Sequence, residues 1–380
     1  MNNKSIKSKK MLFSLLALGV LFASAFIVKC STTKPDDAMQ PYFMTVAYQS
    51  KKIAYSEDGL NWLETNMPAG GDELYPDQWR SICYGKDKFV AVGGGNLLPA
   101  YSTNGLDWSN GKIPDIGENW YLMSVCYSKE KDMFVAVGAV DGKSIVIYST
   151  NGIDWKKVVL DEDEDYNLCT VCYGKGMFVT FSKNYSYKTE DYSLVAYSKN
   201  GREWIIEKPG AIQPPTVANT WNGICYGKDK FVAVSGSNDH DKAVYSPNGE
   251  TWTPTDMPSA VHWNSVCYGE SKDMFVAVGA YSVESKNRPI AAYSTDGTSW
   301  SYIATSPLSN AYNWRSVCYG NDKFVAVSYD NSGEVSAGKI AVSNDGINWE
   351  VVPEAVAPSA GRLSVCFGYV DAEELKRRLF

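Results

Sequence analysis

A seven-residue motif, Ser-x-Asp/Asn-Gly-x-x-Trp, occurs seven times in this chain at nearly constant spacing. Its copies are Ser56–Trp62, Ser102–Trp108, Ser149–Trp155, Ser198–Trp204, Ser246–Trp252, Ser294–Trp300 and Ser343–Trp349. Successive Trp residues of the motif are separated by 46, 47, 49, 48, 48 and 49 positions. A constant period near 48 indicates a repeat architecture, in which each unit must stack on its neighbours to bury a core.

The residues of the motif predict a hairpin. Asn-Gly or Asp-Gly between two apolar runs favours a type I′ turn, which needs positive φ at both central residues. Glycine adopts that conformation without a Cβ clash, and the Ser and Asp or Asn side chains can bond the turn amides. The Trp that ends the motif is expected to pack as a large apolar anchor.

A second signature precedes each hairpin and supplies two more strands. In its clearest copy, 79–93, the stretch Ser-Ile-Cys-Tyr predicts strand A, Gly-Lys-Asp-Lys a turn, and Phe-Val-Ala-Val strand B. After a variable loop, an Ala-Tyr-Ser type of stretch predicts strand C, and strand D begins near the motif Trp. The siblings lie at 221–235, 263–279 and 314–328, with variants at 122–138 and 168–182 that place Leu at the Trp position.

Four short antiparallel strands per repeat predict an all-β, seven-bladed β-propeller. The chain starts inside a blade, at the strand B of Phe43–Tyr48, and ends with the strand A of Leu363–Phe367. We expect these two strands and Ile53–Ser56 to form one shared blade, because pairing the ends removes the free edges of an open ring. A sandwich and an open solenoid are the alternatives. The predicted divisions are 1–30 export signal, 31–41 tether, 42–368 propeller and 369–380 tail, the last with a helical pattern from Asp371.

The motif resembles the Asp-box (BNR) repeat of sialidase-like propellers. The usual box has one further residue between its Asp and Gly, so this chain carries a shortened variant. The resemblance implies that the boxes are structural turns on the face opposite the active face. It also implies an alternative function, that of a sialidase-like glycoside hydrolase.

The N-terminus reads as an export signal. Four Lys in the first ten residues precede the apolar run Met11–Val28, which is followed by Lys29 and Cys30. This arrangement resembles a bacterial lipoprotein signal and makes Cys30 the expected lipidation site. Cleavage near Ala23-Ser24-Ala25, giving a soluble secreted protein, and an uncleaved membrane anchor are the alternatives. All three place the propeller outside the cytoplasm, in the cell envelope or secreted.

Charge and cysteine usage restrict the possible partners. The first 29 residues hold five Lys and no acid, so without them the net charge falls from −7 to −12. No nucleic-acid partner is expected, because phosphate binding needs a basic face. Seven of the nine Cys recur at one repeat position: Cys83, Cys126, Cys172, Cys225, Cys267, Cys318 and Cys366. Equivalent positions on successive blades lie too far apart for disulfides, so buried free thiols are predicted.

Variable loops and aromatic residues direct the search for a site. The connections from strand D to the next strand A, and from B to C, vary in length and emerge on one face, where binding usually lies. Five Trp outside the boxes stand near the start of strand A, close to the mouth of the expected axial channel. Two roles are open to them, stacking on a sugar or wedging between blades. They are Trp79, Trp120, Trp221, Trp263 and Trp314.

Arginine is scarce, with seven in the chain, yet three lie at the start of strand A in consecutive blades: Arg80, Arg315 and Arg362. Such a cluster resembles the carboxylate-binding arginines of sialidases, since a guanidinium group binds a carboxylate through two hydrogen bonds. Arg362 is one position out of register with the other two relative to the repeat Cys, so strand alternation can direct it elsewhere. Pairing of surface Arg with Asp77 or Glu118 is the alternative.

Other chemistries lack residues. His240 and His262 are the only histidines and do not form a metal-ligand spacing or a catalytic triad. No Gly-rich stretch joins a strand to a helix, so no nucleotide cofactor is expected. The acidic run Asp161–Asp165 could attract calcium, but a solvated loop is the simpler interpretation. The sequence therefore predicts a monomeric surface binding module for a glycan or protein, with no cofactor or metal, rather than an enzyme.

Overall fold

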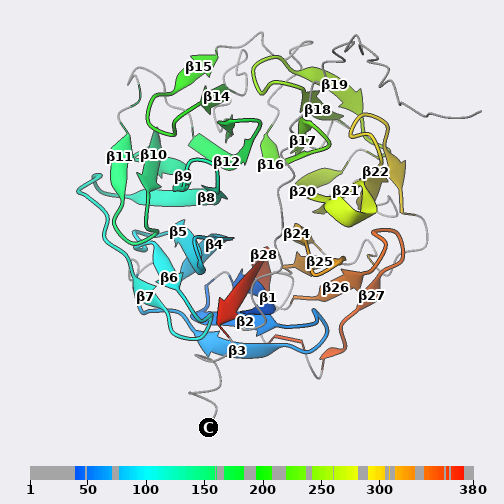
Figure 1. The fold of residues 1–380 in the computed structure, drawn as a ribbon, viewed down its shortest axis with the longest axis horizontal. Helices are drawn as coiled ribbons and strands as arrows, with labels where there is room; N and C mark the ends of the chain where they lie inside the picture. The colour runs from blue at the N-terminus through cyan, green and yellow to red at the C-terminus, as the bar shows by residue number, and fades with distance from the viewer. Residues whose placement is uncertain are drawn as a thin grey trace, which may run out of the picture. The chain divides into compact units, whose positions relative to one another are not determined.

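Seven four-stranded antiparallel sheets are arranged in a ring, with one edge strand of each sheet nearest the centre (Figure 1). This computed structural model describes residues 39–47, 49–70, 77–158, 160, 167–183, 194–207, 220–236, 242–259, 261–280, 290–303, 308, 313–329, 338–354, 357–358 and 361–371. All of them belong to the second of two units, 1–37 and 38–380. The predicted all-β, seven-bladed propeller is confirmed.

The blades are numbered here along the chain, and their strands are given from the innermost outwards. Blade 1 holds β4 (Gln78–Gly85), β5 (Lys88–Gly94), β6 (Ala100–Ser102) and β7 (Ser109–Asn110). Blade 2 holds β8 (Trp120–Ser128), β9 (Met133–Val140), β10 (Lys143–Ser149) and β11 (Lys156–Val158). Blade 3 holds β12 (Asn167–Gly174), β13 (Met177–Lys183), β14 (Val195–Ser198) and β15 (Ile205–Glu207). Blade 4 holds β16 (Trp221–Gly227), β17 (Lys230–Ser235), β18 (Lys242–Ser246) and β19 (Thr253–Asp256).

Blade 5 holds β20 (His262–Gly269), β21 (Met274–Ala280), β22 (Ala291–Ser294) and β23 (Ser301–Tyr302), with the 3-10 turn η1 (Glu270–Lys272) between its first two strands. Blade 6 holds β24 (Trp314–Gly320), β25 (Lys323–Ser328), β26 (Ile340–Ser343) and β27 (Glu350–Val351). Blade 7 holds β28 (Arg362–Asp371), β1 (Met39–Ala47), β2 (Lys52–Ser56) and β3 (Leu63–Asn66). Among the described residues no helix is long and apolar enough to cross a membrane.

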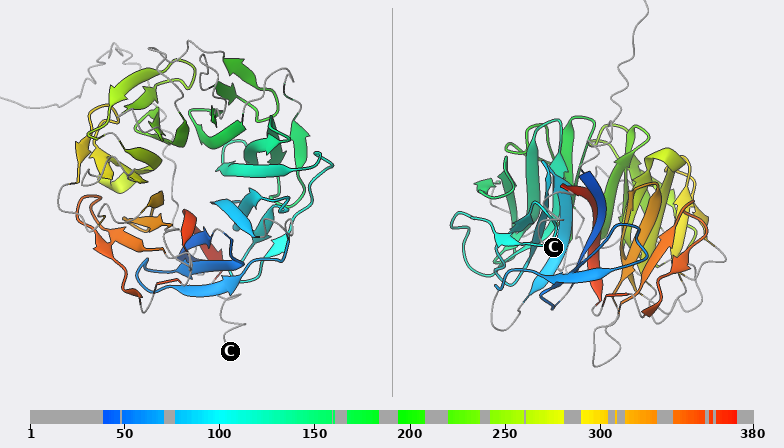
Figure 2. Two further views of the ribbon diagram at one scale, coloured as in Figure 1. Left: turned by 180° about the vertical axis from the view of Figure 1, so that it is seen from behind. Right: turned by 60° about the horizontal axis from the view of Figure 1, so that its bottom comes forward.

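Blade 7 is built from both ends of the propeller, as predicted. Strand β28 pairs with β1 in a register that sets Phe367 opposite Phe43, and β1 pairs with β2 (Figure 2). Strand β1 begins at Met39 and β28 continues to Asp371, so the sheet extends a few residues beyond the predicted 42–368 at each end. The predicted helical tail and the tether lie largely outside the described residues.

The Asp-box turns differ from the prediction in their backbone. Only the Gly of each box has positive φ, between 70° and 78°, and the preceding Asp or Asn does not, so these are not type I′ turns. Instead Oδ1 of the Asp or Asn accepts the backbone N–H groups of the two residues after the Gly. In the first box the donors are Leu60 and Asn61, each at 2.8 Å from Asp58. Satisfying those two amides with one side-chain oxygen outweighs the hairpin preference of the dipeptide.

Type I′ turns form at the A–B connections instead. Lys86 and Asp87 both have positive φ, 48° and 56°, and join β4 to β5 as a two-residue loop between the paired Gly85 and Lys88. The same geometry recurs at Lys228-Asp229 and Asn321-Asp322. The tight hairpin of the repeat is therefore the one between its two inner strands.

The apolar core lies between neighbouring blades. The B strands are buried along most of their length, and one cluster joins Val90 and Val92 of blade 1 to Phe134 and Trp155 of blade 2. The box Trp takes part as predicted, and in five of the seven boxes its indole N–H also donates to the carbonyl of the box Gly, at 2.7 Å for Trp62. Each blade therefore contributes residues to two cores, one shared with the blade before it and one with the blade after it. A single repeat could not bury these apolar residues alone.

The inner strands interlock by shape and by hydrogen bonds. In six of the seven blades the Tyr or Phe after the repeat Cys packs on a Gly in the inner strand of the preceding blade, and Ser128 stands in place of that Gly in blade 2. A Cβ placed on Gly227 would lie 2.2 Å from Cγ of Tyr268. The amide of Val125 donates to Ser81 of the preceding blade at 3.2 Å. The closing contact has the same form, with the amide of Ile82 donating to Ser364 at 3.3 Å.

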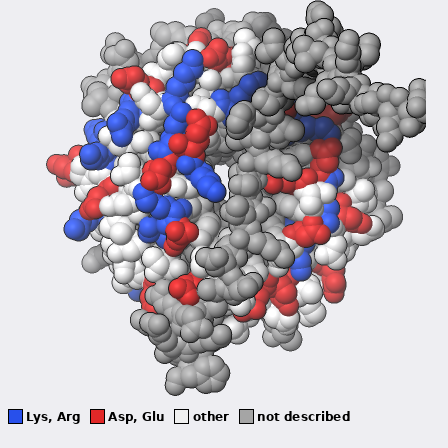
Figure 3. Space-filling model, viewed as in Figure 1, with Lys and Arg blue, Asp and Glu red and all other residues white. Residues whose placement is uncertain are grey.

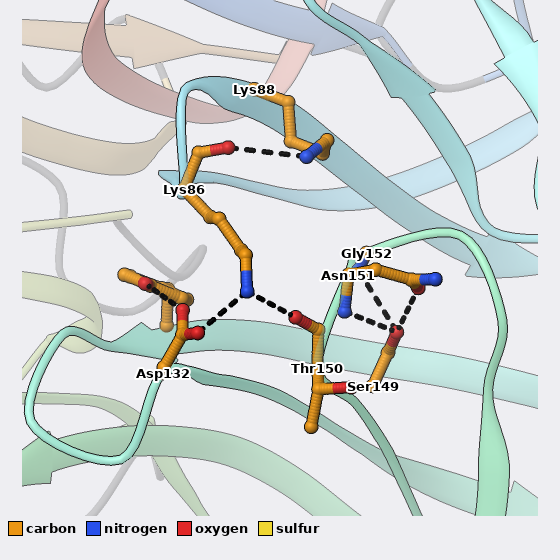
Figure 4. A network of polar contacts seen from close by, with 8 residues as sticks. Lys86, Lys88, Asp132, Ser149, Thr150, Asn151 and Gly152 are labelled. Carbon is orange, nitrogen blue, oxygen red and sulfur yellow. Dashed lines mark hydrogen bonds and ion pairs between the residues drawn. The ribbon is translucent and has the colours of Figure 1, made fainter.

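The face that carries the boxes is held together by contacts between blades. The ammonium of Lys86 in the A–B turn of blade 1 reaches Asp132 at 2.5 Å and the Thr150 carbonyl at 2.9 Å, both in blade 2 (Figure 4). Lys228 repeats this pattern with Asp273 and Thr295 at 2.6 and 2.9 Å. These polar groups form hydrogen bonds and ion pairs between neighbouring blades, which supports a structural role for this face.

The repeat cysteines are free thiols, as predicted, and so is Cys169. They are buried or half-buried on the inner strands. Burial raises the pKa of each repeat thiol, that of Cys83 well above its ordinary value, and the neighbouring Cys126 raises it further. Low-dielectric surroundings disfavour the thiolate, so these side chains act as small apolar groups.

We expect Gly227→Ala to destabilise the ring, because the added methyl would overlap the Tyr268 ring. Overpacking of this kind costs about 1–3 kcal/mol. Gly70→Ala is the control, since its Cβ would meet only Leu97 Cδ2 at 3.4 Å. Thermal unfolding of both variants, and of Gly227→Ala combined with Tyr268→Ala, tests this. Equal melting temperatures for the two single variants would contradict the interlock.

Acid should weaken the three boxes that carry Asp. Burial raises the pKa of Asp58, but hydrogen bonds from Asn61, Leu60 and Ser56 together outweigh it and bring the value from 3.8 to about 2. Asp345 behaves alike, at about 2, and the pKa of Asp296 is also lowered. A carboxyl with a lowered folded-state pKa contributes stability above its unfolded value that is lost as pH falls through the folded value.

We therefore expect a loss of stability between about pH 4 and pH 2 that shrinks in the triple variant Asp58→Asn, Asp296→Asn, Asp345→Asn. Four boxes already carry Asn with the same amide contacts, so the substitution should preserve the turns at neutral pH. Denaturant unfolding at pH 7 and pH 3 measures the difference. An undiminished loss at pH 3 would show that these carboxylates are not responsible.

Candidate functional site

A β-bulge interrupts the inner strand of every blade, at the end where the variable connections join. The pairing of the two innermost strands slips there by one residue, for example between Trp79 and Ser81 in blade 1. A bulge changes the direction of the extra side chain, and bulges are common beside functional sites. In ring order the seven extra residues, here called the bulge ring, are Arg80, Met123, Cys169, Asn222, Asn264, Arg315 and Leu363.

The bulge ring separates buried from accessible side chains. All seven of its members are partly exposed, whereas the residue before each of them is buried. The chemistry of the ring varies from blade to blade, while the strands around it hardly change. An accessible, variable position on a rigid, repeated strand is the best-defined candidate for a site in the described part of the chain.

The five Trp expected near the centre are part of the cores between blades. Trp79, Trp263 and Trp314 have 0% of their surface exposed, Trp221 has 1% and Trp120 has 7%. Trp263 packs against its neighbours and donates its indole N–H to the Ser259 carbonyl at 3.1 Å. This burial supports wedging between blades over stacking on a sugar, because a ligand would have to open a blade interface to reach these rings. Contact of the five Trp with a ligand stays an untested prediction.

Arg362 does not join the other two arginines. It occupies the position that holds Trp in four other blades, and only 1% of its surface is exposed. Its guanidinium group lies along blade 7, donating to the Lys52 carbonyl at 2.9 Å and to Glu64 at 2.6 Å. Burial lowers its pKa to about 10, although Glu64 opposes the shift. The predicted cluster of three is therefore a pair, and the register offset is the cause.

Arg80 and Arg315 are close enough to influence each other. They occupy the same bulge position in blades 1 and 6, on either side of blade 7. Burial lowers the pKa of Arg315, with Tyr329 opposing the shift and the positive charge of Arg80 adding to it. Arg80 donates to the neutral amide oxygen of Gln78 at 3.2 Å. The pair thus places two like charges beside the shared blade.

Three other members of the bulge ring serve as links between blades. Asn222 donates to the Trp263 carbonyl at 3.2 Å, and Asn264 donates to the Trp314 carbonyl at 2.8 Å. The Cys169 thiol lies 2.9 Å from the Trp221 carbonyl. Each side chain contacts the inner strand of the following blade, so the bulge ring links blade 3 to blade 4, blade 4 to blade 5 and blade 5 to blade 6.

Neither the bulges nor these links were anticipated from the sequence. A signal was available, since aligning the seven inner strands on their Cys shows one position of mixed chemistry directly after the Trp or Leu. The expected absence of metal ligands concerns residues that are only partly described. Within the described residues, no group of three or more His, Cys, Asp or Glu side chains is arranged to hold a metal ion. Cys30, His240 and the acidic run Asp161–Asp165 lie outside them.

No protein-family model matches this chain, and no curated protein matches it in sequence. Several solved structures share its fold. Virginiamycin B lyase from Staphylococcus aureus aligns with a TM-score of 0.57 at 12% identity over 88% of this chain and 96% of the lyase. A catalytically inactive variant of that lyase with quinupristin aligns at 0.57, 9% identity, 77% of this chain and 93% of the other.

A chain of the mitotic checkpoint complex aligns with a TM-score of 0.52 at 9% identity, over 78% of this chain and 84% of that chain. At identities this low, the likeness supports the propeller fold and leaves the activity open. The site of this protein must therefore be argued from its own residues.

In blade 6 the positions of Arg362 and Glu64 are occupied by Trp314 and Val351, and this apolar pair serves as the reference for a test. Trp314 belongs to an apolar cluster, and Val351 packs against that cluster. We expect Arg362→Trp or Glu64→Val alone to destabilise the protein, by about 3 kcal/mol, because each leaves one buried or half-buried charge without its partner. The double variant should recover most of that loss, since it reproduces the blade 6 pair. Denaturant unfolding of the three variants measures the coupling, and strictly additive losses would contradict it.

Proposed function

We propose that this protein is an exported, lipid-anchored binding module that recognises a glycan or protein ligand on the face where the variable connections emerge. The observation that carries the proposal is the bulge ring. It presents seven partly exposed side chains of different chemistry on one rigid frame, at the end of the inner strands to which the variable loops connect. Binding surfaces of this kind combine a fixed scaffold with positions that tolerate variation.

The distribution of charge on the surface is typical of a protein that binds a particular ligand, and not of one that binds any polyanion. Over the described part of the face in Figure 3, basic and acidic side chains are interspersed. A protein that binds nucleic acid through its phosphates uses a continuous basic face instead. Arg80 and Arg315 therefore stand out as a local pair of charges within a mixed surface.

The anchor is the second part of the proposal, and it rests on the sequence around Cys30. An apolar run followed by Cys and a polar spacer would place lipid nine positions before β1 begins at Met39. One acyl chain binds a membrane only marginally, and two or more hold it stably. A lipid-anchored propeller would display its loops to ligands in the cell envelope.

The binding proposal is tested with residues 31–380 on glycan and peptide arrays. We expect a ligand whose binding is lost, by tenfold or more, when Arg80 and Arg315 are both replaced with Ala while the melting temperature is retained. Arg202→Ala is the control, because this Arg sits in a box turn 5.2 Å from the Tyr148 ring. Ligand binding that survives the double variant but fails in the control would place the binding surface elsewhere.

Localisation has its own test in the full-length chain. Cys30→Ser should move the protein from the membrane fraction to the soluble fraction, or block its maturation, and should abolish incorporation of labelled palmitate. Unchanged labelling in Cys30→Ser would exclude lipidation at this residue. It would favour a cleaved export signal or an uncleaved membrane anchor instead.

A further inference from the structure

The chain enters the propeller on the face that carries the boxes, here called the box face. Strand β1 is strand B of blade 7, and its Phe43 lies opposite the box residue Ser56, as Phe89 lies opposite Ser102 in blade 1. Each strand B runs from the box face toward the end that carries the bulge ring, here called the bulge end. Strand β1 begins four residues before its Phe, whereas strand B of every other blade begins one residue before it. Met39 therefore lies beyond the level at which the other blades turn.

The entry point is held in place by pairing and packing. Strand β28 runs antiparallel to β1, and its last residue pairs with Met39. Val370, one position earlier, is wholly buried, and its Cγ1 would lie 3.6 Å from a Cβ placed on Gly105, the box glycine of blade 1. The ring centres of Tyr369 and Tyr84 are 6.3 Å apart. The first residue of β1 is thus fixed on the box face.

The chain before β1 has a limited reach. Under the proposed lipid anchor, nine positions separate Cys30 from Met39. A fully extended chain covers at most about 3.6 Å per residue, so the lipid and the start of β1 are no more than about 32 Å apart. This upper limit follows from covalent geometry and does not depend on the conformation of the tether.

That reach is too short to bring the bulge end flat against the membrane. Strand β1 has nine residues, and a rise of about 3.3 Å per residue sets its two ends about 27 Å apart. A tether that turned the ring over would also have to cross β2 and β3, which are spaced about 4.8 Å apart, before it ran along the blade. The path is about 37 Å even without side chains, which is longer than the tether.

We infer that the anchored protein turns its box face toward the membrane and its bulge ring away from it, so that the ligand of the bulge ring is not a component of the anchoring membrane. This inference rests on the proposed function and adds the side from which the ligand approaches. A glycan or protein that is soluble, or that is carried on another surface, meets this requirement. A head group of the anchoring membrane does not.

The charges of the box face make the tether, and not adhesion to lipid, the cause of this orientation. Three lysines of its A–B turns each form an ion pair with an aspartate of the following blade. The pairs are Lys86–Asp132, Lys228–Asp273 and Lys272–Asp322. Anionic lipids attract clusters of basic residues. Lysines that are already paired with acids contribute little to such attraction.

The test uses the full-length lipidated chain in vesicles of phosphatidylethanolamine and phosphatidylglycerol. Two exposed lysines of blade 2 give matched probe positions, Lys129 in the A–B turn on the box face and Lys143 at the start of β10 at the bulge end. Strand β9 separates them by about 26 Å. Each is replaced in turn by an azide-bearing amino acid that is coupled to a fluorophore, and a quencher is attached to the lipid head groups. We expect the probe at position 129 to be quenched at least twofold more strongly than the probe at position 143.

Lengthening the tether separates its effect from adhesion of the box face. About thirty Gly and Ser residues inserted after Asp37 add a flexible segment with a root-mean-square length of about 30 Å. The ring can then turn over, so we expect the two probes to be quenched equally. A difference that persisted undiminished after the insertion would contradict control by the tether.

Equal quenching of the two probes in the chain of natural length, or stronger quenching at position 143, would overturn the inference. Neither result removes the proposed binding module, because array binding by residues 31–380 is measured without a membrane. A full-length chain that is not retained on vesicles would contradict the lipid anchor itself. The entry geometry is then measured on residues 31–380, held on nickel-chelating lipid through an N-terminal histidine tag. The same twofold difference is expected there, and its absence would contradict the entry geometry.

Discussion

The contact between neighbouring inner strands is the interaction on which the rest of this structure depends. In six blades a Tyr or Phe ring packs against a glycine of the blade before, and in five blades a serine hydroxyl accepts a hydrogen bond from a backbone amide of the blade after. These contacts leave no room for a side chain at most of the glycines, so the blades can meet in only one way. The positions of all other elements, including the bulge ring, follow from that fit.

The two faces of the ring use polar groups for opposite purposes. On the box face, lysines, aspartates and turn carbonyls join one blade to the next. At the other end of the inner strands, the bulges leave one side chain per blade partly exposed. Three of those side chains, those of Cys169, Asn222 and Asn264, also link one blade to the next. The box face is thus used for contacts between blades, whereas the bulge end combines three such contacts with the residues of the proposed binding surface.

Blade 7 shows how closure and the candidate site are connected. It is assembled from the two ends of the propeller, and Arg362 spans it from β28 to Glu64 on β3. That ion pair takes Arg362 away from Arg80 and Arg315, which remain on either side. An arginine one residue out of register became part of the core, because alternate residues of a strand point to opposite sides and a bulge changes the alternation only locally.

Repetition made the architecture readable from the sequence alone. Seven copies of a turn motif at a spacing near 48, with apolar strands between them, determined the number of blades, the four strands in each and the closure of the ring, since no other arrangement pairs the first strand B with the last strand A. The buried free cysteines followed from the same repeat. Tertiary structure decided what single residues do. The Asp–Gly turns are not type I′ because one oxygen caps two amides there, and the five Trp are buried because they pack between blades. Arg362 lies apart from Arg80 and Arg315 because it is one residue out of register with them and pairs with Glu64. Such outcomes depend on the neighbouring blade, which lies about 48 residues away in sequence and within hydrogen-bond distance in space.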